Sequence, residues 1–126
     1  MRVRQKILVV DDSDIALELA RIRLEEAGFE VETLNSPFGF SAALWAQKPD
    51  LVLLDVSMPA LQGDRLLQIA HRQGGKRRCP MVLYSDRSEQ ELRELAQSCG
   101  ADGYVRKSAD FKLVVETIRK LLAAPR

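Results

Sequence analysis

The chain has 126 residues, 46% of them hydrophobic and 29% charged. This is the length and composition of one globular domain, so we expect a single domain over residues 1–126 with its core at about residues 6–122. The 19 Lys and Arg residues nearly balance the 18 Asp and Glu residues, and the resulting net charge of +1 argues against direct binding of nucleic acid.

The sequence favours a cytoplasmic location without membrane association. Its apolar runs are about four or five residues long, far below the roughly 20 that span a bilayer. The basic start is followed by an apolar run that Asp11 and Asp12 interrupt, so we expect no signal peptide. Cys79 and Cys99 lack the spacing of a zinc site and are expected to be reduced.

The first half of the chain alternates short apolar runs with helical periodicity. Runs at residues 7–10, 31–34 and 51–54 predict buried strands. The spacing after the first run predicts the buried stripe of a helix that ends near Gly28. That stripe consists of Ile15, Leu19 and Ile22. Aromatic residues in the second helical region, Phe38, Phe40 and Trp45, are expected to cover the sheet.

The second half continues this alternation. In a third helical region His71 is expected to be exposed, and the basic run at residues 74–78 is expected to be a solvated loop. Runs at residues 81–84 and 104–105 predict two more strands, and the helix between them ends near Gly100. The apolar stripe of this helix consists of Leu92, Leu95, Ala96 and Cys99. The apolar stripe of the last helix consists of Phe111, Val114, Val115, Ile118, Leu121 and Leu122.

Strictly alternating strands and helices predict a parallel sheet, because each parallel neighbour requires a right-handed crossover. Five such units form an open, doubly wound (βα)5 α/β sandwich, since the chain is about half as long as an eight-stranded barrel requires. In this architecture the functional site lies at the carboxyl ends of the strands.

Polar side chains directly follow four of the predicted strands. They are Asp11, Asp12, Asp55, Ser85 and Lys107. Two like charges about 4 Å apart repel by roughly 4 kcal/mol at an effective dielectric near 20, so three carboxylates need compensation beyond one lysine. An all-oxygen donor set suits Mg²⁺ better than zinc. An alternative is that Asp11, Asp12 and Asp14 only cap the first helix, which we favour for Asp14 and leave open for the other two.

The order of these residues closely resembles the receiver domains of two-component response regulators, over Lys6 to Leu122. The motifs are Asp11-Asp12, Asp55, Met58-Pro59 with Gly63, Ser85, and Lys107. The resemblance implies a flavodoxin-like fold with a five-stranded parallel sheet, of the single-domain chemotaxis-regulator type. It also implies a phosphorelay signalling switch rather than an enzyme with external turnover.

The resemblance also implies a role for each matching residue. Asp55 would accept a phosphoryl group from a histidine kinase or a histidine phosphotransfer protein. Asp12, Asp55 and the backbone carbonyl of Ser57 would ligate Mg²⁺, and Asp11 would do so directly or through a water. Ser85 would donate its hydroxyl to one phosphoryl oxygen, while Lys107 would pair with another.

A second implied feature is a switch formed by Ser85 and Tyr104, which would alter a partner-binding face on the fourth helix, fifth strand and fifth helix. The alternative for Tyr104 is an aromatic filling the edge of the sheet. The downstream partner would be a protein, and we expect a stand-alone receiver. Charged residues expected on this face are Arg87, Glu91, Arg106 and Lys112.

Two positions depart from the family pattern. Ser108 replaces the usual proline after the lysine, so we predict a trans Lys107–Ser108 peptide bond. Asp86 follows Ser85 where a small residue is usual, and its charge should disfavour access of a phosphoryl group. An Asp86→Ala variant that left phosphorylation by a small phosphodonor and autodephosphorylation unchanged would contradict this hypothesis.

Two rival functions remain. The first is a pseudo-receiver, a protein-interaction module that phosphorylation does not switch, and Ser108 and Asp86 are its support. The second is a phosphatase with an aspartyl nucleophile at Asp12 and a second acid at Asp14.

Overall fold

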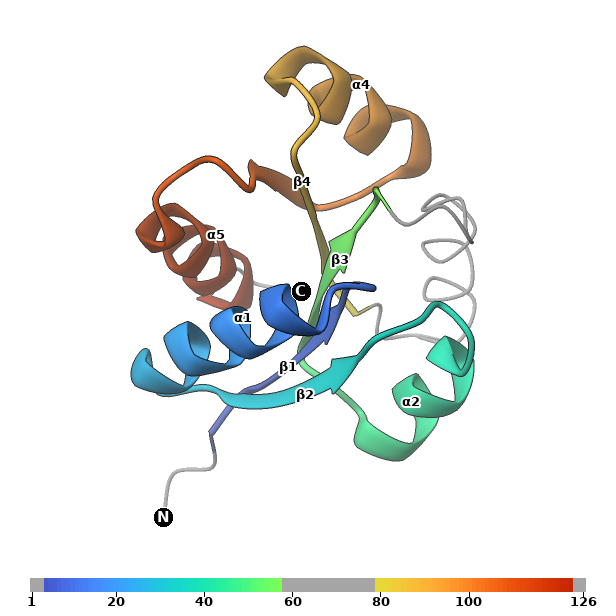
Figure 1. The fold of residues 1–126 in the computed structure, drawn as a ribbon, viewed down its shortest axis with the longest axis vertical. Coiled ribbons are helices and arrows are strands. Elements are labelled where there is room, and N and C mark those ends of the chain that lie inside the picture. The colour runs from blue at the N-terminus through green and yellow to red at the C-terminus, as the bar shows by residue number, and fades with distance from the viewer. Residues whose placement is uncertain (1–3, 58–78, 124–126) are drawn as a thin grey trace.

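The computed structural model describes residues 4–57 and 79–123. The strands are β1 (Lys6–Val10), β2 (Glu30–Leu34), β3 (Leu51–Asp55), β4 (Met81–Ser85) and β5 (Gly103–Arg106). The helices in this part of the chain are α1 (Asp14–Glu26), α2 (Phe40–Gln47), α4 (Glu89–Cys99) and α5 (Phe111–Ala123) (Figure 1).

The five strands form one parallel sheet in the order β2-β1-β3-β4-β5. The chain leaves β1 toward β2 on one side and later returns to place β3 on the other side of β1. The strand order therefore reverses between β1 and β3, and in such sheets ligands bind beyond the carboxyl ends of the strands at that point. The predicted fold class, an open doubly wound α/β sandwich, is confirmed.

Alternating strand residues face two separate apolar clusters. Leu8, Val52 and Leu83 point into a cluster that contains Phe40 of α2 and Leu92 of α4. The neighbouring residues of the same strands, among them Ile7, Leu53 and Val82, point into a second cluster with α1 and α5. The central strands β1, β3 and β4 are thus buried on both faces, which explains why they read as nearly continuous apolar runs.

The stripe predicted for the first helix is wrong. Ile15, Leu19 and Ile22 are 76%, 56% and 44% exposed. The face of α1 that packs on the sheet is made by Leu17, Ala20 and Leu24 instead. Both sets have helical spacing, so the periodicity alone could not decide which one faces the core.

The prediction for the aromatic residues of the second helical region is only partly right. Phe40, the first residue of α2, is 1% exposed and fills the core beneath the helix. Phe38 and Trp45 are 74% and 67% exposed and do not cover the sheet. The helix is only eight residues long, so it presents a narrow face to the sheet.

The predicted ends of two helices are confirmed. Gly28, directly after the C-cap of α1, and Gly100, the C-cap of α4, have φ of 97° and 79°. Residues with a Cβ rarely adopt this left-handed conformation, so glycine is suited to both positions. At the other end of α1 the N-cap is Ser13, whose hydroxyl accepts a hydrogen bond from the Ala16 N–H at 3.2 Å.

Several sequence expectations lie outside the described residues. They concern the third helix, exposed His71, the basic loop at residues 74–78, and the motif positions Met58, Pro59 and Gly63. Within residues 4–57 and 79–123, no helix is long and apolar enough to cross a membrane.

Candidate functional site

The carboxyl ends of four strands bring the predicted polar residues together. Asp55 and Ser85 are the last residues of β3 and β4, while Asp11 and Lys107 directly follow β1 and β5. The register pairs Val10 with Leu54, so Asp11 and Asp55 come next on adjacent strands. The sheet itself thus places groups that are far apart in the sequence at one edge.

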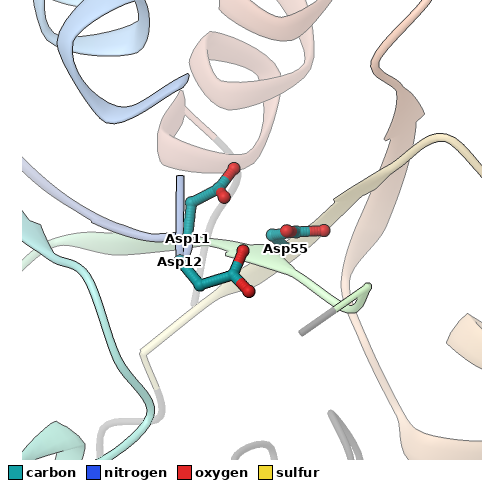
Figure 2. Close-up of side chains that lie close together, drawn as sticks. All are labelled: Asp11, Asp12 and Asp55. Carbon is teal, nitrogen blue, oxygen red and sulfur yellow. The ribbon is translucent and has the colours of Figure 1, made fainter. Parts of the chain in front are cut away.

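Three carboxylates form the centre of this site. Asp11, Asp12 and Asp55 each offer an oxygen atom, and these atoms all lie within 4.8 Å of one another (Figure 2). Asp11 and Asp55 are 2% and 3% exposed, whereas Asp12 is exposed to solvent. The site therefore combines two carboxylates shielded from water with a third that is exposed to solvent.

Lys107 neutralises part of this charge. Its Nζ donates a hydrogen bond to Asp11 Oδ2 at 2.8 Å and lies 3.4 Å from Asp55 Oδ2. Its backbone N–H donates to the Ser85 carbonyl at 2.8 Å, and its ammonium lies 5.6 Å from the centroid of the Tyr84 ring. These contacts fix Lys107 between the two buried carboxylates.

The electrostatics of the pocket shift two pKa values. Burial raises the pKa of Asp55, and the nearby charge of Asp11 raises it further, against the lowering effects of the Ser57 N–H and Lys107. Burial acts to lower the pKa of Lys107, but the hydrogen bond to Asp11 and the charges of Asp55 and Asp11 outweigh it, so that pKa is raised. The fold thus favours the protonated form of both groups, which is the charged form of Lys107 and the neutral form of Asp55.

The donor set fits a hard divalent cation. All three candidate ligand side chains supply carboxylate oxygens, and one lysine is the only cation that contacts the two buried ones in the described part of the chain. Mg²⁺ binds through carboxylates and retains several waters. Because Asp12 is exposed to solvent, there is room for these waters. Asp11, Asp12 and Asp55 are therefore suited to hold Mg²⁺.

The hydroxyl predicted at the end of β4 lies in a polar network. Ser85 is completely buried, and its Oγ lies 2.8 Å from the Oγ of Ser57. The Arg87 N–H donates to the same Ser85 oxygen at 3.2 Å, and the Ser57 N–H donates to Asp55 Oδ1 at 2.9 Å. The loop after β3 therefore contacts the Asp55 carboxylate through its backbone and β4 through a side chain.

The two departures from the family pattern lie at the rim. Peptide bonds of the described residues are all trans, which confirms the prediction for Lys107–Ser108. Asp86 is exposed, and its charge contributes to raising the pKa of Tyr84, for which burial is the larger cause.

Tyr104 lies away from the carboxylates, on the face formed by α4 and β5. Its ring is half-buried against the core, and its hydroxyl accepts a hydrogen bond from Arg93 Nε at 3.3 Å. The same hydroxyl donates to Glu89 Oε1 at 3.5 Å. The charged residues expected on this face, Arg87, Glu91, Arg106 and Lys112, are all exposed.

Sequence reasoning missed three features of the site. Ser13 caps α1, and Asp14 instead lies in the first helical turn, where its carboxylate accepts from Asn35 at 3.4 Å. The Ser57 hydroxyl contact to Ser85 and the position of Tyr84 under Lys107 were also missed. Ser13 could have been found because serine is a preferred N-cap residue and stands just before the predicted helix, whereas the other two depend on tertiary contacts.

Comparisons with known proteins agree on one family. The family model for the response regulator receiver domain matches residues 7–119. The transcriptional regulatory protein CseB of Streptomyces avermitilis is 31% identical over 122 residues, covering 97% of this chain and 51% of that protein. The phosphate regulon transcriptional regulatory protein PhoB of Rhizobium meliloti is 30% identical over 117 residues, covering 93% and 52%. The chain thus spans about half the length of these curated relatives.

Solved structures show the same fold. A CheY-like response regulator receiver domain protein from Methanospirillum hungatei superposes with a TM-score of 0.83 at 26% identity, covering 95% of this chain and 94% of that one. A signal receiver domain from Bermanella marisrubri gives 0.80 at 27% identity, covering 95% and 99%.

Proposed function

Because this chain belongs to the response regulator receiver domain family, whose model matches residues 7–119, we propose that it is a switch phosphorylated on Asp55. Receiver domains are signalling components of two-component systems, and turnover of external substrates is not their role. The observation that carries the proposal is the buried Asp55 carboxylate, which ends β3 next to Asp11 and Lys107.

In the proposed reaction the Asp55 carboxylate is the nucleophile. One of its oxygens forms a bond to phosphorus, the bond from phosphorus to the donor nitrogen breaks, and the electron pair of that bond leaves with the donor imidazole. Lys107 balances negative charge on the transferred group, and Ser85 donates its hydroxyl to a phosphoryl oxygen. The product is an acyl phosphate at the edge of the sheet.

Receiver domains bind Mg²⁺ at an acidic pocket, and we assign its ligands here to Asp12, Asp55 and the backbone carbonyl of Ser57, with Asp11 acting directly or through a water. A bound Mg²⁺ would neutralise charge on the phosphoryl oxygens. The clustering of the three carboxylates supports this assignment. The protein's own contribution is to hold Asp11 and Asp55 buried and Asp12 exposed to solvent.

We propose that the phosphodonor is a histidine kinase or a histidine phosphotransfer protein and that the domain works in the cytoplasm. The output would pass to a protein through the face of α4, β5 and α5. The curated relatives are named as transcriptional regulatory proteins and are about twice as long as this chain. We propose that this domain itself contacts protein rather than nucleic acid, and its net charge of +1 supports that.

The proposal is tested by brief exposure to a small acyl phosphate with and without Mg²⁺, followed by intact-mass measurement. We expect a Mg²⁺-dependent gain of one phosphoryl group that Asp55→Asn abolishes. Asp14→Asn is the matched control, because it makes the same change at an exposed aspartate outside the cluster, and it should be phosphorylated like the wild type.

The alternative functions give different results in the same experiment. A phosphoryl group found on Asp12, together with a phosphatase activity that Asp14→Asn abolishes, would indicate a phosphatase with an aspartyl nucleophile. Failure of the wild type to gain mass at any Mg²⁺ concentration would indicate a pseudo-receiver and contradict the proposal.

A further inference from the structure

The buried hydroxyl of Ser85 has partners within the protein. Its Oγ lies 2.8 Å from Ser57 Oγ and accepts from the Arg87 N–H at 3.2 Å. Ser85 is 0% exposed, so bulk water cannot readily replace either partner. Ser57 is exposed, and its side chain can therefore exchange its partner for solvent at little cost.

A serine hydroxyl has one proton and two acceptor lone pairs. The Arg87 N–H uses one lone pair of Ser85. A phosphoryl group on Asp55 offers only acceptor oxygens, so it can be bound by Ser85 only through the Ser85 proton. Either hydroxyl can be the donor in the contact between Ser57 and Ser85. The competition exists in the arrangement in which Ser85 donates, because the phosphoryl group and Ser57 then require the same proton.

Ser57 is well placed for this competition. Its N–H donates to Asp55 Oδ1 at 2.9 Å, which fixes the residue beside the acceptor carboxylate. Its side chain then spans from the loop after β3 to the end of β4, two neighbouring strands of the sheet. The same residue thus contacts both the group that would receive the phosphoryl and the hydroxyl that would bind it.

We propose that Ser57 is a positioning residue that holds the Ser85 hydroxyl in the unphosphorylated protein and is displaced from it when Asp55 carries a phosphoryl group. This inference rests on the proposed function. The Ser57–Ser85 hydrogen bond then opposes the phosphorylated state, and its loss is part of the switch.

The test is a double-mutant cycle that uses beryllium fluoride with Mg²⁺ as a mimic of the phosphoryl group. Calorimetry measures the concentration of beryllium fluoride that half-saturates the protein. It is applied to the wild type, Ser57→Ala, Ser85→Ala and the double variant. Ser57→Ala should lower the half-saturating concentration by about threefold to tenfold, because the competing hydrogen bond is gone. Ser57→Thr, which keeps a hydroxyl, should return it toward the wild-type value.

The cycle separates this role from a purely steric one. In the Ser85→Ala background the Ser57→Ala change should have no effect, because the hydroxyl it acts through is absent. The inference would be overturned if Ser57→Ala changed the half-saturating concentration by the same factor in both backgrounds, or in neither. Beryllium fluoride binding that depends on Asp55 would in that case still support the proposed function. Binding that Asp55→Asn leaves intact, or no binding by the wild type, would overturn both.

Discussion

Lys107 is the residue on which the balance of charge in the pocket depends. Its ammonium contacts two carboxylates that are both at most 3% exposed, while its own side chain is 20% exposed. Removing one partner of a buried ion pair costs more than the pair itself contributes, because the remaining charge stays buried without compensation. The raised pKa of Lys107 means that this stabilisation is present below pH 10.5 and is lost as the pH rises through the folded-state pKa.

We therefore expect Lys107→Met to lower the free energy of unfolding by about 3 kcal/mol in a chelating buffer. Urea denaturation at neutral pH measures this change. The control is Lys112→Met, which removes an exposed lysine from α5 and should change stability by less than about 0.5 kcal/mol. Equal losses in the two variants would show that Lys107 does not stabilise the buried carboxylates.

In contrast to the charge of Lys107, the charge of Asp55 lowers the stability of the folded protein. Its pKa in the folded protein is raised above 3.8, mainly by burial, so the folded state binds the proton more tightly than the unfolded state. As the pH rises from about 3.8 through the folded-state pKa, the free energy of unfolding falls. An ionised Asp55 thus costs stability at neutral pH.

In a chelating buffer, Asp55→Asn should unfold at a higher temperature than the wild type at pH 7, and the difference should shrink as the pH is lowered toward 4. Thermal unfolding across this pH range checks the sign. Asp110→Asn, the same change at an exposed aspartate, should not raise the unfolding temperature, because that carboxylate accepts from the Lys112 N–H. A wild type more stable than Asp55→Asn at pH 7 would contradict the expected sign.

At the scale of the element, α1 has two apolar faces and only one of them packs on the sheet. Leu17 is 6% exposed and lies in the core cluster with α5, whereas Leu19 is 56% exposed. Two leucines of one helix thus differ in burial while sharing side-chain chemistry. Replacing each of them by alanine separates the effect of burial on the free energy of unfolding from the effect of helix propensity.

Leu17→Ala should lower the free energy of unfolding by about 2–5 kcal/mol, because it removes buried methyl groups and leaves a cavity. Leu19→Ala should change it by no more than about 0.5 kcal/mol. Chemical denaturation of both variants measures the difference. Similar losses at the two positions would mean that Leu19 is buried in solution.

The strands could be predicted closely from the sequence, and the helix faces only in part. The central strands β1, β3 and β4 are buried on both faces, so an apolar run such as residues 51–54 has one explanation. In α1 the Leu and Ile residues satisfy helical spacing twice, and the choice between Leu17 and Leu19 is made by tertiary packing. The carboxylate cluster could be predicted because strand ends carry it, whereas the contact between Ser57 and Ser85 depends on loop geometry.

At the scale of the whole molecule, β4 and β5 connect the pocket to the outer face. Ser85 pairs with Arg106, and two residues earlier Leu83 pairs with Tyr104. Arg106 Nε also donates to the Arg87 carbonyl at 3.1 Å. Ser85 is therefore a direct neighbour of residues on the β5 surface, and we expect a change at Ser85 to reach them.

With beryllium fluoride and Mg²⁺ bound, amide hydrogen exchange should change at residues 85–93 and 103–107. Strand β2 (Glu30–Leu34), at the opposite edge of the sheet, should keep its exchange rates. Mass spectrometry of peptides after timed exchange measures both regions, and Asp55→Asn supplies the control without a response. A uniform change across the sheet would contradict a switch confined to this edge.

The hydrogen bond from Lys107 to Asp11 joins residues 96 positions apart in the sequence. We expect this contact to form late in folding, because the entropy of closing so long a loop must be offset by strands that are already paired. A fragment that ends before residue 107 contains all three carboxylates and lacks the lysine that compensates them. On the proposed function, a partly synthesised chain would therefore carry the acceptor without its compensating charge, and we expect only a chain that includes Lys107 to compete for phosphoryl groups.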